Sequence, residues 1–272
     1  MIKTEYRVQG SADITIAVVA DLHERKPDQV LEILRTVQPD VIAVPGDLLE
    51  NTGHTSYESV EDEEDGADWL SRAVAHIIHS IDYFVEEHPA IFKRKRSEAS
   101  KQNAYRFLMK ASEIAPTVVS LGNHERYLTE EDEEVIQSAG VQILNNSSVV
   151  IKNVLFGGIP SKQSGRIDHV FLEKFSRSEM YKVLLCHHPE YYKTIAPYNI
   201  DMVVSGHAHG GQIRVADYGI FSPGQGLLPK LTKGVYDNRL VVSAGCSNTA
   251  AIPRIGNPCE VVVVRVHILR RI

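Results

Sequence analysis

Five short motifs rich in histidine and carboxylate side chains are spread along this chain, and each follows a run of apolar residues. The runs have the length and composition of buried strands, and they lie at 14–20, 41–44, 117–121, 183–186 and 202–205. The motifs that follow them are, in chain order, Asp21-Leu22-His23, Gly46-Asp47, Gly122-Asn123-His124-Glu125, His187-His188-Pro189 and Gly206-His207-Ala208-His209. Because the motifs are far apart in the sequence, only a fold can bring them together.

Helical and extended patterns alternate in the first half of the chain. Apolar residues repeat at helical spacing from Val30 to Val37, after Pro27 and between the first two strands. This alternation predicts a layered α/β domain, in which loops at the carboxyl ends of the strands meet at one crevice. We therefore expect the five motifs to meet there. Further strands are predicted in the second half, at 147–151 and 154–157 around a two-residue turn, and at 240–243 and 261–266.

The side chains of the motifs are of the types that bind divalent metal ions. Aspartate and asparagine oxygens combined with neutral imidazole nitrogens suit Mn, Fe, Zn, Co or Ni. The three cysteines, Cys186, Cys246 and Cys259, do not have the spacing of a structural thiolate zinc site. Two ions roughly 3.5–4 Å apart can clamp the attacking and leaving oxygens of a phosphoryl displacement, and they lower the pKa of bound water towards about 7. The motifs together predict a centre for two divalent metal ions.

Each motif alone is weak, because Asp-x-His and Gly-Asp are common in ordinary turns. The most specific motif is the glycine-flanked pair of histidines at 206–211, since two histidines among glycines are poor core residues. The order and spacing of all five motifs resemble the calcineurin-like metallophosphoesterase family. The Gly-His-Ala-His-Gly-Gly-Gln form at 206–212 is similar to a bacterial branch with phosphodiesterase-like and lipid-sugar pyrophosphatase-like members, and the resemblance continues through 222–226 and 252–254.

The resemblance implies a fold and a set of ligands. The fold is a four-layer α/β/β/α sandwich of two mixed sheets, with a two-metal centre at one end of the sheets. The first ion would be held by Asp21, His23, Asp47 and His209. The second would be held by Asp47 as a bridge together with Asn123, His187 and His207.

The resemblance also implies roles for residues that do not bind metal. His124 would be catalytic, protonating the leaving oxygen or stabilising the phosphoryl charge, with the adjacent acid orienting it; here that acid is Glu125, where Asp is commoner. Of the adjacent pair His187 and His188, the spacing to Pro189 favours His187 as the ligand. Three further polar residues are candidate substrate contacts, although such residues are more often structural: Gln212, Arg214 and Arg254.

The predicted activity is hydrolysis of a phosphoric ester bond. A metal-bound hydroxide would attack a phosphomonoester, phosphodiester or pyrophosphate of a small molecule, which is the expected partner. The sequence after Asp47 is Leu-Leu-Glu, without the Arg of protein Ser/Thr phosphatases, so a phosphoprotein substrate is disfavoured. The alternatives are a catalytically inactive scaffold or binding protein of the same fold, and a nuclease. A scaffold usually lacks ligands that are present here, and a net charge of −6 provides no strong nucleic-acid signal.

We interpret residues 1–272 as a single domain with a helical insertion at about 51–103. An amphipathic stripe runs from Leu70 to Val85 within it, and the insertion is either a helical hairpin packed on the domain or a cap over the active site. No apolar stretch approaches the roughly 20 residues that cross a bilayer. The first ten residues lack the apolar region of a signal peptide, and the sparse cysteines suit a reducing cytosol, so we expect a cytoplasmic protein.

Overall fold

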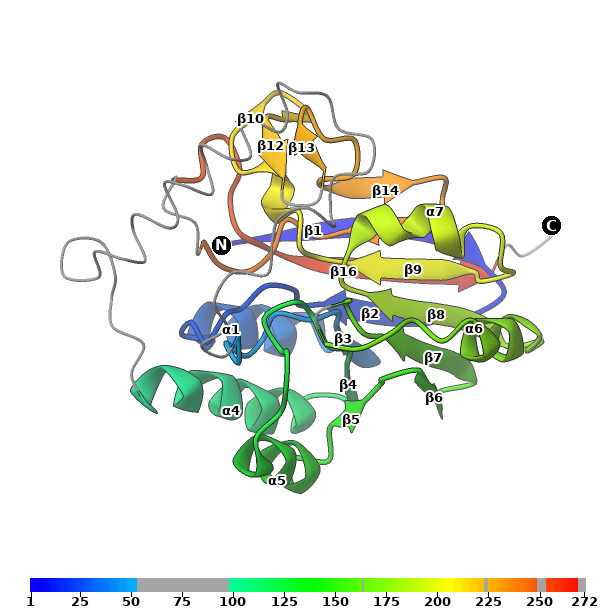
Figure 1. The fold of residues 1–272 in the computed structure, drawn as a ribbon, viewed down its shortest axis with the longest axis horizontal. Coiled ribbons are helices and arrows are strands. Elements are labelled where there is room, and N and C mark those ends of the chain that lie inside the picture. The colour runs from blue at the N-terminus through cyan, green and yellow to red at the C-terminus, as the bar shows by residue number, and fades with distance from the viewer. Residues whose placement is uncertain (53–97, 163, 223–224, 249–252, 269–272) are drawn as a thin grey trace.

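Two six-stranded sheets form the centre of the protein in a computed structural model that describes residues 1–52, 98–162, 164–222, 225–248 and 253–268 (Figure 1). The first sheet has the strand order β1-β16-β2-β3-β4-β5. Strands β2 to β5 are parallel to one another, β16 is antiparallel to β2, and β1 is parallel to β16. The strands span Ile2–Gly10 (β1), Ile14–Val18 (β2), Val41–Val44 (β3), Thr117–Val119 (β4), Gln142–Ile143 (β5) and Glu260–Ile268 (β16).

The second sheet has the order β14-β15-β9-β8-β7-β6. Its four central strands are parallel, while β14 and β6 pair antiparallel at the two edges. Its strands span Ser147–Ile151 (β6), Val154–Ile159 (β7), Tyr181–Cys186 (β8), Met202–Ser205 (β9), Gly234–Tyr236 (β14) and Leu240–Val242 (β15). Short elements follow β8 and β9: the 3-10 helices Pro189–Tyr191 (η2) and His209–Gly211 (η3), and the small strands Arg214–Val215 (β10), Tyr218–Gly219 (β11), Phe221–Ser222 (β12) and Gly226–Leu227 (β13).

Helices cover the outer face of each sheet, so the molecule has four layers. The first sheet is covered by Asp28–Val37 (α1), Glu98–Ser112 (α4) and Glu130–Ser138 (α5), and the second by His169–Ser176 (α6) and Tyr192–Ile195 (α7). Successive strand residues alternate between the layers: Ile16 and Val18 pack between the two sheets, and Ala17 packs under the helices. The α/β/β/α sandwich of two mixed sheets is confirmed.

The predicted strands correspond closely to the observed ones. The ranges 41–44 and 202–205 coincide with β3 and β9, and the predicted hairpin is the antiparallel pair β6 and β7. Its turn residues Lys152 and Asn153 both have positive φ, of 49° and 61°, as a two-residue hairpin turn requires. The sequence analysis missed β1, an edge strand that is half exposed. The alternation of Ile2, Tyr6 and Val8 was the available signal.

The predicted insertion at about 51–103 overlaps the beginning of α4, which starts at Glu98. Phe107, Leu108 and Ala111 of α4 are buried against the first sheet. The amphipathic stripe from Leu70 to Val85 lies within 53–97, outside the described residues, so the hairpin and cap hypotheses stay predictions. Among the described helices, none combines the length and apolar character that a membrane span needs.

Candidate metal centre

The seven predicted ligands gather where strands of both sheets end. Asp21 and His23 follow β2, Asp47 follows β3, and Asn123 follows β4, all in the first sheet. The second sheet supplies the remaining three from the ends of β8 and β9, namely His187, His207 and His209. The ligands are buried apart from Asn123 and His209, which are partly exposed. The site therefore forms where strands of the two sheets end.

Sharp backbone turns aim these side chains inward. Five of the predicted ligands have left-handed backbone angles, with φ between 44° and 63°: Asp21, His23, Asp47, His207 and His209. Residues other than glycine adopt this region rarely, at a cost of roughly 1–2 kcal/mol each. Such strain clusters at functional sites, where the surrounding structure enforces it. Packing thus holds these ligands in place against their local preference.

Motif glycines leave room for the carboxylates. A Cβ atom on Gly122 would lie 2.2 Å from Oδ1 of Asp47, and one on Gly206 would lie 2.8 Å from Oδ2 of Asp21. Both separations are shorter than the van der Waals contact between carbon and oxygen. The glycines in the third and fifth motifs are therefore needed for close approach to an aspartate of another motif.

A first group of ligand atoms comes from Asp21, His23 and His209, whose atoms lie within 4.8 Å of one another. Asp47 joins them, with Oδ2 at 3.6 Å from Nε2 of His23. Oδ1 of Asp21 accepts a hydrogen bond from the backbone N–H of His207 at 3.0 Å. Within the described part of the chain, Oδ2 of Asp21 and Nε2 of His23 are buried without a hydrogen-bond partner. Both atoms are available as metal ligands.

A second group surrounds Nε2 of His187. Oδ2 of Asp47 lies 3.1 Å from this nitrogen and Oδ1 of Asn123 lies 3.0 Å from it. Nε2 of His207 is buried and has no hydrogen-bond partner among the described residues. Asp21, Asp47 and His187 also place ligand atoms within 4.8 Å of one another. Asp47 thus lies between the two groups, as a bridging carboxylate must.

Buried carboxylates and imidazoles at the site shift the pKa values of one another. Burial alone would raise the pKa of Asp47, yet His187, His124 and His23 hold the pKa of that carboxyl well below its usual range. Burial alone would lower the pKa of His187, but the neighbouring Asp47 outweighs the effect of burial and raises that pKa to about 9. Buried carboxylates need a cation nearby, and metal ions displace protons from such imidazoles. The donor set fits two divalent ions.

His124 lies at the exposed side of the first group, with 30% of its side chain accessible. Its backbone N–H donates to Oδ1 of Asp47 at 3.0 Å, and its Nε2 lies 3.8 Å from Oδ2 of the same residue. Its Nδ1 lies 2.9 Å from Oε2 of Glu50. Burial would lower the pKa of His124, but Asp47 and Glu50 raise it to about 10.

Glu125, for which the resemblance implied a role in orienting His124, has its carboxylate hydrogen-bonded to backbone groups. Both of its carboxylate oxygens accept hydrogen bonds from backbone N–H groups, at 2.5–2.9 Å; the donors are Asp47, Leu48, Leu49 and Gly122. Glu125 therefore ties the loop after β3 to the loop after β4. Glu50 contacts the His124 ring instead. The sequence offered a signal, a carboxylate three residues after Asp47, which the sequence analysis used only to note the missing Arg.

Arg254 reaches the centre from the C-terminal part of the chain. Its guanidinium donates to the carbonyls of Ala244 and Ser247 and lies 3.0 Å from Nδ1 of His209. A guanidinium only donates, so a neutral His209 accepts at Nδ1 and carries its proton on Nε2. Metal binding through Nε2 therefore requires release of this contact. Burial, together with His23 and Arg254, lowers the pKa of His209 to about 3.

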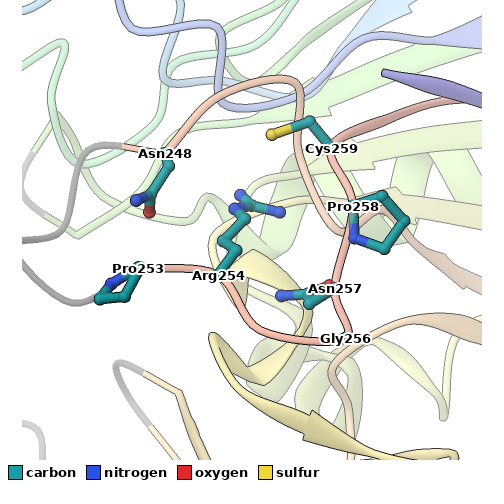
Figure 2. A pocket seen from close by; sticks show the side chains of 7 residues that line it. All are labelled: Asn248, Pro253, Arg254, Gly256, Asn257, Pro258 and Cys259. Atoms are coloured by element: carbon teal, nitrogen blue, oxygen red, sulfur yellow. The ribbon is translucent and has the colours of Figure 1, made fainter.

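An open surface pocket of about 430 Å³ adjoins Arg254. Figure 2 shows the guanidinium extending towards the space between Asn248 and Cys259. The other two candidate substrate contacts are engaged within the protein. Gln212 donates to Oδ1 of Asn248 at 2.8 Å, and Arg214 donates to the carbonyl of Gly210 and the hydroxyl of Thr232. These contacts support the structural interpretation of Gln212 and Arg214.

A family described as calcineurin-like phosphoesterase matches residues 14–211. An uncharacterized metallophosphoesterase of Aquifex aeolicus is 29% identical over 158 residues, which cover 54% of this chain and 59% of that protein. The uncharacterized protein YpbG of Bacillus subtilis is 25% identical over 264 residues, covering 95% of this chain and 83% of YpbG. Phosphodiesterase YaeI of Escherichia coli is 30% identical over 115 residues, covering 38% of this chain and 40% of YaeI. The matches thus span less than two thirds of the Aquifex and Escherichia proteins.

Two solved structures share an overall likeness at low sequence identity. One is 13% identical with a TM-score of 0.45, and the match covers 86% of this chain and 91% of that chain. The other is the sulfate thiohydrolase SoxB of Thermus thermophilus in complex with glycerol, 14% identical with a TM-score of 0.39. It is matched over 96% of this chain and 58% of its own. Likeness at these TM-scores supports no conclusion about activity.

Proposed function

The chain belongs to the calcineurin-like phosphoesterase family, and we propose that it hydrolyses a phosphoester bond of a small molecule with the help of two divalent metal ions. The observation that carries the proposal is the meeting of ligand atoms from both sheets around Asp47. Buried atoms of Asp21, His23 and His207 have no hydrogen-bond partner among the described residues, which supports the proposal because buried polar atoms are nearly always paired in folded proteins.

In this proposal the residues divide into two ligand sets that share Asp47. Asp21, His23 and His209 complete the first, and Asn123, His187 and His207 complete the second. The ions, when bound, supply a water of lowered pKa and positive charge for the phosphoryl oxygens. The strained backbone of the ligand loops supports this arrangement, since it holds the donors in place before substrate arrives.

His124 is the proposed catalytic residue. Because Glu50 accepts from Nδ1, the Nε2 atom of His124 is left to donate a proton to the leaving oxygen or to hydrogen-bond a phosphoryl oxygen. Its partial exposure supports contact with a substrate, whereas the ligand histidines His23 and His187 are buried.

A phosphodiester is the first substrate class to test, because the matching Escherichia coli protein is named a phosphodiesterase. Phosphomonoesters and pyrophosphates stay in the comparison. An inactive scaffold is disfavoured by the presence of every expected ligand. A nuclease is disfavoured by the net charge of −6.

The test is metal analysis of the purified full chain, paired with turnover measurements. Aryl monoesters, aryl diesters and nucleotide or sugar pyrophosphates are compared in the presence of Mn, Fe, Zn, Co or Ni. Asp47→Asn and His209→Ala are expected to lose turnover while circular dichroism stays unchanged. His169→Ala, on the exposed start of α6, is the control and should keep wild-type turnover. Near-wild-type activity in Asp47→Asn would contradict the proposal.

A further inference from the structure

His188 lies buried beside the second ligand group, with 1% of its surface exposed. The centroid of its ring is 4.0 Å from that of His207 and 5.2 Å from that of His187. One nitrogen from each of the three rings lies within 4.8 Å of the others. The sequence analysis favoured His187 as the ligand of the adjacent pair. The fold instead brings both members of that pair into the same cluster.

A carboxylate fixes the tautomer of His188. Its Nδ1 lies 2.9 Å from Oε1 of Glu190, and a carboxylate can only accept, so Nδ1 carries the hydrogen. The lone pair of the ring is therefore on Nε2. This atom is buried and finds no hydrogen-bond partner in the described ranges. The large majority of buried side-chain nitrogens in folded proteins are paired, so this nitrogen beside the second ligand group favours a ligand role.

The same pattern occurs at two predicted ligands. Nδ1 of His23 lies 2.5 Å from a carboxylate oxygen of Glu50, and Nδ1 of His187 lies 2.9 Å from the carbonyl oxygen of Pro45. In each ring an oxygen acceptor orients the imidazole and leaves Nε2 for the centre. Metal-binding histidines almost always donate their second N–H to a carboxylate or carbonyl in this way. His188 with Glu190 has the arrangement of a ligand.

We propose that His188 binds the second divalent ion together with His187 and His207, and that Glu190 positions its ring. The inference rests on the proposed function, which supplies the second ion. The ring is also held by stacking: Tyr191 lies over His188 with a centroid distance of 4.8 Å and an interplanar angle of 16°. Glu190 and Tyr191 both belong to η2, directly after His188, so one turn of chain holds the ring from two sides.

A third imidazole changes which metal the second position prefers. Imidazole nitrogen suits Zn, Co and Ni, whereas Mn prefers carboxylate, carbonyl and water oxygens. Both positions have two oxygen ligands, Asp21 and Asp47 in the first and Asp47 and Asn123 in the second, but the first has two imidazoles where the second would have three. The two positions are therefore expected to differ, with Zn, Co or Ni favoured over Mn where His188 binds.

The experiment follows the histidine nitrogens directly. Metal-free full-length protein labelled with ¹⁵N is titrated with Zn²⁺, and two-bond ¹H–¹⁵N spectra report each ring nitrogen. We expect the Nε2 resonances of His187, His188 and His207 to move together as the second ion binds, while Nδ1 of His188 keeps its proton. Calorimetric titration should then show that His188→Asn weakens binding of the second ion by more than about 100-fold, beyond the roughly 10–100-fold cost of losing a supporting contact, and leaves binding of the first ion unchanged.

Matched variants separate positioning from ligation. Glu190→Gln keeps the size of the side chain and removes its charge. It should therefore lower the affinity for Zn²⁺ at the second position by less than His188→Asn does. His169→Asn, an exposed histidine change, should alter neither affinity. His188→Asn should lower the affinity of the second position for Zn²⁺ more than its affinity for Mn²⁺.

The outcomes distinguish this inference from the proposed function. If wild-type protein binds two ions and the His188 Nε2 resonance stays still, the inference is overturned and the proposed function stands. If wild-type protein binds fewer than two ions, both are overturned. Should His188→Asn fail to fold, the wild-type spectra decide by themselves.

Discussion

Glu50 and His124 are in direct contact, with Oε2 of Glu50 at 2.9 Å from Nδ1 of His124. The other carboxylate oxygen lies 2.5 Å from Nδ1 of His23. Burial would raise the pKa of Glu50, but hydrogen bonds with the two imidazoles hold it well below its usual range. A single carboxylate thus orients both a predicted metal ligand and the proposed catalytic residue.

Replacing this carboxylate should therefore impair both functions. Glu50→Gln keeps the size but offers an amide N–H₂ where one imidazole N–H needs an acceptor. Turnover and affinity for the first ion are expected to fall by about 10–100-fold, the usual effect of losing such a supporting contact. Steady-state kinetics and metal titration measure the two effects. Glu32→Gln, an exposed change on α1, is the matched control, and equal kinetics in both variants would contradict the role of Glu50.

His124→Ala should slow the hydrolysis of substrates with poor leaving groups most. A general acid contributes about 10²–10⁴-fold when the leaving oxygen needs a proton, and far less when it departs readily. A series of aryl phosphoesters with leaving groups of graded pKa provides the measurement. Metal content should stay at the wild-type level. An equal loss across the series would argue against proton donation by His124.

Glu125→Gln should destabilise the fold. The native carboxylate accepts four backbone hydrogen bonds in a buried position, and an amide can accept with only one of its two heavy atoms. We expect the free energy of unfolding to fall by about 3 kcal/mol, measured by urea denaturation. Glu32→Gln again serves as the control, with a change within about 0.5 kcal/mol. An unaltered denaturation midpoint in Glu125→Gln would show that the four contacts are dispensable.

Asp132 should make stability depend on pH in the acid range. Burial would raise the pKa of its carboxyl, but hydrogen bonds from Thr129, Tyr105 and Lys101 hold it below the ordinary 3.8. The folded state therefore binds this proton less readily than the unfolded chain does. The stabilisation is present above about pH 4 and is lost as pH falls through the lowered pKa.

Asp132→Asn tests this directly. Its free energy of unfolding at pH 7 should be lower by about 2 kcal/mol, because charged hydrogen bonds to Asn51, Tyr105 and Thr129 are weakened. Below pH 4 the difference from wild type should shrink. Asp28→Asn is the control, since Asp28 forms an exposed ion pair with Arg106 that contributes little. A constant difference between wild type and Asp132→Asn from pH 7 to pH 3 would contradict the assignment.

Removal of metal should lower the thermal stability of the wild-type protein. Ions that bind only the folded state stabilise it by about 2.7 kcal/mol each at a free concentration of 100 times Kd. Differential scanning calorimetry with and without a chelator measures the shift in Tm. In Asp47→Asn the shift should be much smaller, because both ions share this ligand. A wild-type Tm that changes neither with chelator nor with added Zn²⁺ would rule out metal binding at this centre.

Local patterns in the sequence predicted the strands that carry the ligands. The runs 41–44 and 202–205 coincide with β3 and β9 because a buried parallel strand is apolar on both faces and ends where polar residues begin. The strand β1 was missed for the opposite reason. It is an edge strand with many exposed residues, so its sequence lacks the run of apolar residues that marks a buried strand. The family resemblance, and not periodicity, supplied the two-sheet architecture.

By itself, the sequence determined the ligand types, their order and their places after strands, since these depend on local hydrophobicity and residue identity. Only the tertiary structure decided which atoms meet. In the folded protein Glu50 contacts His124, and Glu125 joins the loop after β3 to the loop after β4. The tertiary structure also placed His188 beside His207, although the sequence favoured its neighbour. Contacts of this kind depend on how loops from two sheets pack at distances of a few ångströms. The pattern of residues in one loop does not determine where the other loops lie.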